Sequence, residues 1–170
     1  MSLSICEQLG ESGAVSTPER ERMAGELQMA MQRSTMFTVL LHHATASKAG
    51  MNVTDAQCVN ALSLDGPQTP GQLAQLMGIT TGGAITAVID RLEKAGYVRR
   101  TRDPDDRRRV IVELVEENVA RFGRYFEPIG RVFRDRLDGY TDEQIAFLLD
   151  WIRHNNEAMP RVIEEIRKLP

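Results

Sequence analysis

Positive charge is concentrated in one short segment of an otherwise acidic chain. Between positions 91 and 109 there are eight basic residues and four acidic ones, a local charge of +4 in a protein of net charge −3. The basic residues are Arg91, Lys94, Arg99, Arg100, Arg102, Arg107, Arg108 and Arg109. Clustered guanidinium and ammonium groups attract phosphate, so the segment is expected to contact a polyanion. A solvated hairpin whose arginines serve only solubility is the alternative.

The basic segment begins at the end of a predicted helix. Thr80 is a good N-cap, and Gly96 stands where a left-handed residue would end the helix. Between them runs an apolar stripe of Ile85, Val88, Ile89 and Leu92. The opposite face, which is expected to stay open to a ligand, carries Thr81, Gly82, Thr86, Ala87 and Asp90.

A shorter helix is predicted immediately before this one. Thr69 and Gln72 have the spacing of a capping box, with Pro70 at the first helical position. Gly78 ends this helix, so that only a very short turn separates the two helices. A short helix, a tight turn containing glycine and a longer helix form a helix-turn-helix, whose second helix enters the major groove of DNA.

Two short β-branched segments, 97–102 and 109–114, follow and are joined by the turn-forming sequence Asp-Pro-Asp-Asp. The region from about 62 to 114 resembles the winged helix-turn-helix of the MarR (multiple antibiotic resistance regulator) family. The wing of that family reads D-x-x-D-x-R, and here these positions are Asp103, Asp106 and Arg108. The resemblance implies that Arg108 enters the minor groove from the wing tip and that Asp106 orients its guanidinium.

The candidate DNA-binding residues are Thr80, Thr81, Gly82, Thr86, Ala87, Arg91, Arg107, Arg108 and Arg109. No lysine or arginine occurs between positions 49 and 90, so the recognition helix lacks the bidentate readers of guanine. Its threonines and alanine offer only hydroxyl hydrogen bonds and methyl contacts to thymine. Gly82 and Gly83 each cost about 1 kcal/mol of helix propensity, which predicts that they permit close approach to the duplex. Avoidance of a clash within the protein is the alternative.

The flanking sequence predicts further helices. One starts at Ser16 or Thr17 and runs to about Lys48, and another opens with a capping box at residues 54–57 and ends at Asp65. After the wing, a helix over 116–137 should bend at Pro128, and a last helix that begins near residue 141 should break at Pro160. The expected fold is therefore mainly α with a small β-hairpin wing: a winged helix-turn-helix with N- and C-terminal dimerisation helices.

The flanking helices carry more apolar residues than a winged domain of about sixty residues can cover. We therefore expect a flexible tail over 1–15, a winged helix-turn-helix over 51–115, and a helical dimerisation region over 16–50 and 116–170. A homodimer would place two recognition helices one turn of the duplex apart, on a palindromic operator. An intrachain bundle in a monomer is the alternative.

Composition narrows the functional classes. There is no run of apolar residues long enough to span a bilayer and no signal pattern at the N-terminus, so a cytoplasmic protein is expected. Two cysteines, Cys6 and Cys58, cannot form a disulfide framework or a metal knuckle. No catalytic or phosphate-loop motif is present, which argues against an enzyme and leaves no cofactor or metal to assign.

The sequence thus predicts a dimeric, sequence-specific transcriptional regulator. The family resemblance implies a repressor that a small aromatic or apolar effector releases, and the candidate effector-contacting residues are Met36, His42, His43 and Cys58. Each of these also has an ordinary structural role, such as dipole stabilisation by histidine or core packing by cysteine. The alternative function is a winged-helix module whose arginines bind an acidic protein partner.

Overall fold

The computed structural model describes residues 17–169, apart from the side chain at position 121. The predicted tail over 1–15, with Cys6, lies outside the described residues. The chain divides into two compact units, and the boundary falls between Gln57 and Cys58 inside a helix. The described part of the first unit holds α1 (Pro18–Lys48) and the start of α2 (Val53–Asp65). The second unit contains the remaining elements.

Helix α1 begins and ends as the sequence predicts. The Thr17 hydroxyl accepts a hydrogen bond from the backbone N–H of Arg20 at 3.2 Å, and Pro18 occupies the first turn. At the other end, Gly50 has a φ of +70°, a left-handed conformation that favours glycine.

Helix α2 begins earlier than predicted. Val53 is already helical, so Thr54 lies inside the helix, and the predicted capping box at 54–57 is wrong. Asn52 takes the capping role, because its Oδ1 accepts the backbone N–H of Asp55 at 2.8 Å. Asparagine is among the best N-cap residues, and it lies close enough to Thr54 to compete for this position.

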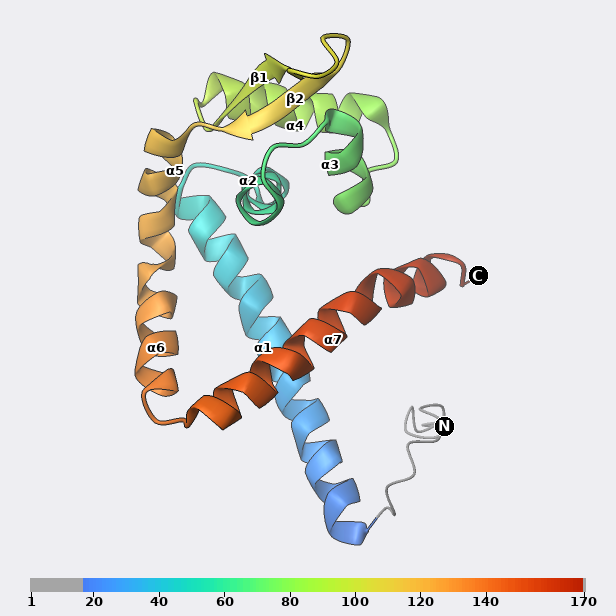
Figure 1. Ribbon diagram of the computed structural model, residues 1–170, viewed down its shortest axis with the longest axis vertical. Helices are drawn as coiled ribbons and strands as arrows, with labels where there is room; N and C mark the ends of the chain where they lie inside the picture. The colour runs from blue at the N-terminus through green and yellow to red at the C-terminus, as the bar shows by residue number, and fades with distance from the viewer. Residues whose placement is uncertain (1–16, 170) are drawn as a thin grey trace. The chain divides into compact units, whose positions relative to one another are not determined.

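The second unit contains a winged helix-turn-helix. Helices α3 (Pro70–Leu76) and α4 (Gly82–Lys94) are followed by the antiparallel strands β1 (Val98–Arg102) and β2 (Val110–Leu114). The strands pair from Val98 opposite Leu114 to Arg102 opposite Val110. In Figure 1 the hairpin runs alongside α4, and α3 lies next to both. The structure therefore confirms the predicted order of helix, turn, helix and wing.

The ends of α3 and α4 test the predicted caps. The capping box of Thr69 and Gln72 is present in full. Helix α4 starts one residue later than predicted, because Thr81 rather than Thr80 is the N-cap, and its side chain makes no capping hydrogen bond. Gly96 is left-handed as predicted, with a φ of +79°. A side chain there would also crowd Asn118, whose amide donates to the Gly96 carbonyl at 2.8 Å.

The core of this unit lies between α4, the hairpin and the helices before them. The predicted stripe of α4 is buried, and the largest fully buried side chains are Val59, Leu73, Ile89, Leu92, Val98 and Val112. A backbone bridge adds a further contact, because Gln68 and Val112 exchange both of their N–H···O=C bonds, at 2.8 and 3.0 Å. This bridge fixes the segment before α3 against the wing.

The helices after the wing test the predictions made at two prolines. The expected helix 116–137 is divided into α5 (Glu116–Gly123), a 3₁₀ turn η2 (Arg124–Phe126) and α6 (Glu127–Leu137), with Pro128 in the first turn of α6. Helix α7 (Asp142–Arg167) runs through Pro160 without a break, so the predicted break there is wrong. Pro160 lacks a backbone N–H, so the carbonyl of Asn156, four residues earlier, loses its helical hydrogen bond. Asn156 is exposed, and water can solvate this carbonyl in place of the missing donor.

Candidate nucleic-acid interface

The outward face of α4 carries the residues that the sequence assigned to base reading. Thr81, Gly82, Thr86 and Ala87 are all exposed, while the apolar stripe of the same helix is buried. Thr80 is also exposed and lies just before the helix. The threonine, glycine and alanine positions therefore share an accessible surface at the N-terminal half of α4.

The two threonines of this face present different hydrogen-bonding groups. The Thr86 hydroxyl donates to the Gly82 carbonyl at 2.9 Å, which occupies its proton, so that this exposed side chain can offer a ligand only an acceptor and a methyl group. The Thr81 hydroxyl makes no capping bond. A base edge would therefore meet an acceptor and a methyl group at Thr86, and both a donor and an acceptor at Thr81.

Gly82 and Gly83 have open space around them. A Cβ atom placed on either residue would meet no other atom of the described chain within 4 Å, outside the helix's own backbone. The alternative explanation, that these glycines avoid a clash within the protein, is therefore wrong. Both residues are exposed in the first turn of α4, where a side chain would project from the accessible face.

Replacing Gly82 by alanine is expected to separate stability from binding. Gly82→Ala should raise the free energy of unfolding by up to about 1 kcal/mol, because alanine loses less backbone entropy in a helix. The same substitution should weaken DNA binding if the glycine permits close approach. Urea unfolding and fluorescence anisotropy measure the two effects. Gly25→Ala in α1, where space is equally open, is the control. A higher free energy of unfolding with unchanged DNA affinity would contradict a role of Gly82 in close approach.

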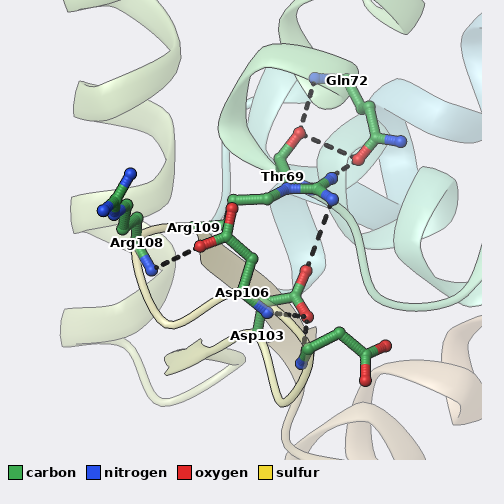
Figure 2. A network of polar contacts seen from close by, with 7 residues as sticks. Thr69, Gln72, Asp103, Asp106, Arg108 and Arg109 are labelled. Carbon is green, nitrogen blue, oxygen red and sulfur yellow. Dashed lines mark hydrogen bonds and ion pairs between the residues drawn. The ribbon is translucent and has the colours of Figure 1, made fainter.

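The turn of the wing is held by Asp103. Its side chain is only 13% exposed, and its Oδ1 accepts the backbone N–H groups of Asp105 at 2.9 Å and Asp106 at 3.3 Å. Its Oδ2 lies 3.6 Å from Nη1 of Arg109. Figure 2 shows this carboxylate at the centre of the turn, between the backbone of the tip and the Arg109 guanidinium.

Asp106 acts on the backbone of Arg108 rather than on its side chain. The Oδ1 of Asp106 accepts the Arg108 backbone N–H at 3.0 Å, as Figure 2 shows. This contact is to the backbone of Arg108, and the expected orientation of the guanidinium by Asp106 stays a prediction. The contact fixes the direction in which the Arg108 side chain leaves the tip. Among the described residues no hydrogen bond or ion pair engages the Arg108 guanidinium, which is exposed.

At least three of the basic residues in the charged segment are paired with carboxylates. Arg99 Nε donates to Glu113 Oε1 at 2.7 Å, and this hydrogen bond raises the pKa of Arg99. Arg109 lies near Asp103, and Arg100 contacts two acidic residues of α4. Asp90 and Glu113 lie just outside the segment of charge +4, and counting them lowers the local charge to +2. The charge available to phosphate is therefore smaller than the sequence implied.

The sequence reasoning left Asp103, Arg100 and Asp90 out of the candidate site. Asp103 stands directly before Pro104, a pattern typical of aspartate that accepts backbone N–H groups in a turn. The partner of Arg100 was harder to find, because Asp90 is ten residues away and belongs to a different element. Arg91, Arg107 and Arg109, which were predicted to bind DNA, are exposed at the end of α4 and on the wing.

The candidate effector residues are divided between the two units. Met36, His42 and His43 lie on α1 in the first unit, where Met36 and His43 are exposed and His42 is half-buried. Cys58 belongs to the second unit and is fully buried. Its burial fits the ordinary role of cysteine as a small apolar core residue.

The described residues contain neither a metal-binding cluster nor a membrane-spanning helix. Residues 17–169 contain no group of three or more His, Cys, Asp or Glu side chains that could hold a metal ion. No helix in the same range is both long and apolar enough to cross a membrane.

Comparison with known proteins identifies the family. The model of the MarR family matches residues 49–109. YcgE, an HTH-type transcriptional regulator of Bacillus subtilis (strain 168), is 34% identical over 131 residues, which cover 77% of this chain and 84% of YcgE. PecS of Dickeya dadantii (strain 3937), also an HTH-type transcriptional regulator, is 33% identical over 80 residues, 47% of this chain and 48% of PecS.

Solved structures share the fold. A MarR family protein from Bacillus stearothermophilus has a TM-score of 0.63 at 21% identity, covering 82% of this chain and 97% of that one. Wild-type MarR of E. coli in its apo form has a TM-score of 0.53 at 20% identity, covering 75% and 94% of the two chains. The sequence relatives are transcriptional regulators and not enzymes, which agrees with the reading of the sequence. The chain belongs to the MarR family and is a winged-helix transcriptional regulator that binds DNA.

Proposed function

We propose that the protein is a homodimeric repressor that reads a palindromic operator. The observation that carries the proposal is the pairing of two features in one unit: an exposed face of threonine, glycine and alanine on α4, and a wing tip from which the Arg108 guanidinium projects. The first suits the major groove and the second the minor groove. The protein would repress transcription by occupying the operator. It would do so in the cytoplasm, where the DNA that it regulates lies.

In this proposal the residues divide into readers and holders. Thr80, Thr81, Thr86 and Ala87 would contact base edges, and Gly82 would bring the helix backbone close to the duplex. Arg91, Lys94 and Arg107 would hold phosphates, while Arg109 would support the turn through Asp103. Arg108 would enter the minor groove, whose width and potential depend on sequence. The DNA-binding region would then be residues 51–115.

The dimer would be formed by the helices outside the winged domain, over residues 16–50 and 116–170. Their large apolar side chains are exposed in the single chain, among them Phe37 on α1, Phe133 on α6 and Phe147 on α7, at 57%, 62% and 68%. Soluble proteins rarely leave so many large apolar groups in water, and a second copy of the same helices would bury them. Two-fold symmetry would also match a palindromic site.

Placing a charge on these helices is expected to separate the dimer. Phe133→Asp with Phe147→Asp should shift the wild-type dimer to monomer, or to unfolded chain where folding depends on association. Sedimentation velocity measures the change. Leu64→Asp on α2 is the control, because Leu64 is also exposed, at 82%, but lies outside the proposed interface. A wild-type protein that sediments as a monomer at micromolar concentration would contradict the proposed dimer.

A small aromatic or apolar effector is proposed as the signal that releases DNA. Exposed apolar surface on α1 could bind such a molecule, and Met36 and His42 are the residues of α1 that we assign to it. Benzoate serves as the test compound, titrated into the protein–DNA complex and followed by anisotropy. Release in the wild type but not in a Met36→Asp variant is expected. Equal release in both proteins would overturn the assignment.

Selection from a pool of randomised duplexes tests the proposal as a whole. The full chain should enrich one inverted repeat, whose half-sites are centred about 10 base pairs apart or a multiple of that distance. Enrichment of a single, asymmetric site would contradict the dimeric reader, and no enrichment at all would contradict sequence-specific binding. The enriched sequence is called the selected duplex below.

A further inference from the structure

Arg100 connects the wing to the recognition helix. It lies on β1, and its guanidinium reaches back to α4, where Nη2 donates to Asp90 Oδ1 at 2.5 Å and Nη1 donates to Glu93 Oε2. Its backbone N–H also donates to Glu93 Oε1 at 3.2 Å. One residue of the wing therefore makes three hydrogen bonds to two carboxylates of α4.

The exposure of the three side chains shows which of them faces inward. Arg100 is 28% exposed, while Glu93 is 41% and Asp90 59% exposed. Partial burial lowers the pKa of Arg100, but the hydrogen bonds to Asp90 and Glu93 outweigh this effect and the pKa is raised. The guanidinium thus sits as a charged bridge behind two carboxylates that remain open to water.

Those two carboxylates lie on the side of α4 where DNA would be. Asp90 is four residues after Thr86 and three before Glu93, so all three positions follow one another along the same side of the helix. A carboxylate near a phosphate is repelled, since like charges at close range oppose binding. Without Arg100, α4 would bring two uncompensated negative charges toward the duplex.

We propose that Arg100 is a positioning residue for DNA binding: its single positive charge offsets part of the negative charge of Asp90 and Glu93 at the DNA surface, and its hydrogen bonds fix the base of the wing against α4. The inference rests on the proposed orientation of α4 toward DNA. In this role Arg100 contacts no phosphate itself. The planar fork of arginine can bond two carboxylates at once, which a lysine ammonium at the same place would do less well.

The neighbouring Arg99 provides a matched control. It lies on the same strand and is also paired, with Glu113 of β2, but adjacent residues of a strand face opposite sides of the hairpin. Removing either arginine deletes one positive charge from the wing. Only the removal of Arg100 leaves carboxylates of α4 without a partner.

The test uses the full chain with Arg100→Gln, with Asp90→Asn and Glu93→Gln together, and with all three substitutions. Anisotropy measures the affinity for the selected duplex at fixed ionic strength. Arg100→Gln alone should weaken binding by roughly tenfold or more, whereas adding it to the Asp90→Asn, Glu93→Gln protein should change affinity less than about threefold. Arg99→Gln should have a smaller effect than Arg100→Gln, and Arg100→Lys should restore part of the loss.

An equal loss on removing Arg100 in both backgrounds would overturn the proposal, because it would make Arg100 a phosphate ligand. Unchanged affinity in Arg100→Gln would also overturn it. Thermal unfolding of each variant shows whether it folds. If Arg100→Gln alone does not fold, the double and triple variants still decide the question, because the proposal predicts nearly equal affinities for them. A wild-type chain that enriches no duplex would instead count against the proposed function, not against the role of Arg100.

Discussion

Raising the salt concentration from about 50 to 200 mM is expected to weaken binding of the selected duplex by roughly 10³- to 10⁵-fold. Each phosphate that a basic side chain neutralises releases condensed counterions, so affinity falls steeply with salt when most contacts are to phosphate. The α4 face supplies threonine, glycine and alanine at its N-terminal half, so phosphate contacts must provide most of the attraction. The expected range corresponds to about 6–10 phosphate contacts per dimer.

The structure allows this number to be checked against individual residues. Among the described residues, four basic side chains of the segment form no ion pair with a carboxylate. They are Lys94, Arg102, Arg107 and Arg108. Two copies of these residues in a dimer would reach the range, even with the paired arginines left out. Anisotropy titrations at several salt concentrations give the slope. A nearly flat dependence would contradict the electrostatic account of affinity.

Arg108→Ala is expected to cost about 1–3 kcal/mol of DNA-binding free energy for each wing that enters a groove. The Asp106 carboxylate fixes the backbone of Arg108, so the side chain loses little conformational entropy when it binds DNA. Folding should be unaffected, since the side chain is exposed and makes no described contact. Anisotropy with the selected duplex measures the loss, and thermal unfolding checks the fold.

Asp106 provides a second test of the same mechanism. Asp106→Ala should weaken binding less than Arg108→Ala, because it loosens the backbone of the tip without removing the guanidinium. Arg107→Ala removes a neighbouring exposed charge and is the control for charge alone. Equal losses of affinity in Arg107→Ala and Arg108→Ala would show that the wing binds DNA only through its net charge. That result would contradict a specific role for Arg108.

Most of the fold could be predicted because its boundaries are set by local interactions. The predicted helix starts near Thr17, Thr69 and Thr141 each depend on residues within three positions along the chain, and the structure confirms all three starts. The left-handed glycines after the helices are equally local. The errors arose where two local signals competed, as at Asn52 and Thr54, or where a proline was tolerated inside a helix, as at Pro160.

The candidate site was predicted less completely because it depends on contacts between distant elements. The exposed face of α4 follows from the apolar stripe on its other side, so the position of Thr86 could be expected. The pairing of Arg100 with Asp90 and Glu93 depends on how β1 lies against α4, which periodicity does not specify. Counting charges along the chain therefore included Arg100 in the segment that attracts phosphate, although its hydrogen bonds are to α4.

We propose that the α4 face contacts bases and that basic side chains contact phosphates. The ratio of affinities for the selected duplex and for a mixed-sequence duplex tests this proposal most directly. Thr86→Ala should lower this ratio, because it removes an acceptor and a methyl group from the reading face. Lys94→Ala should weaken both duplexes alike and leave the ratio unchanged, because a phosphate contact carries no sequence information. If Lys94→Ala abolished the discrimination while Thr86→Ala left it intact, α4 would not read DNA as we propose.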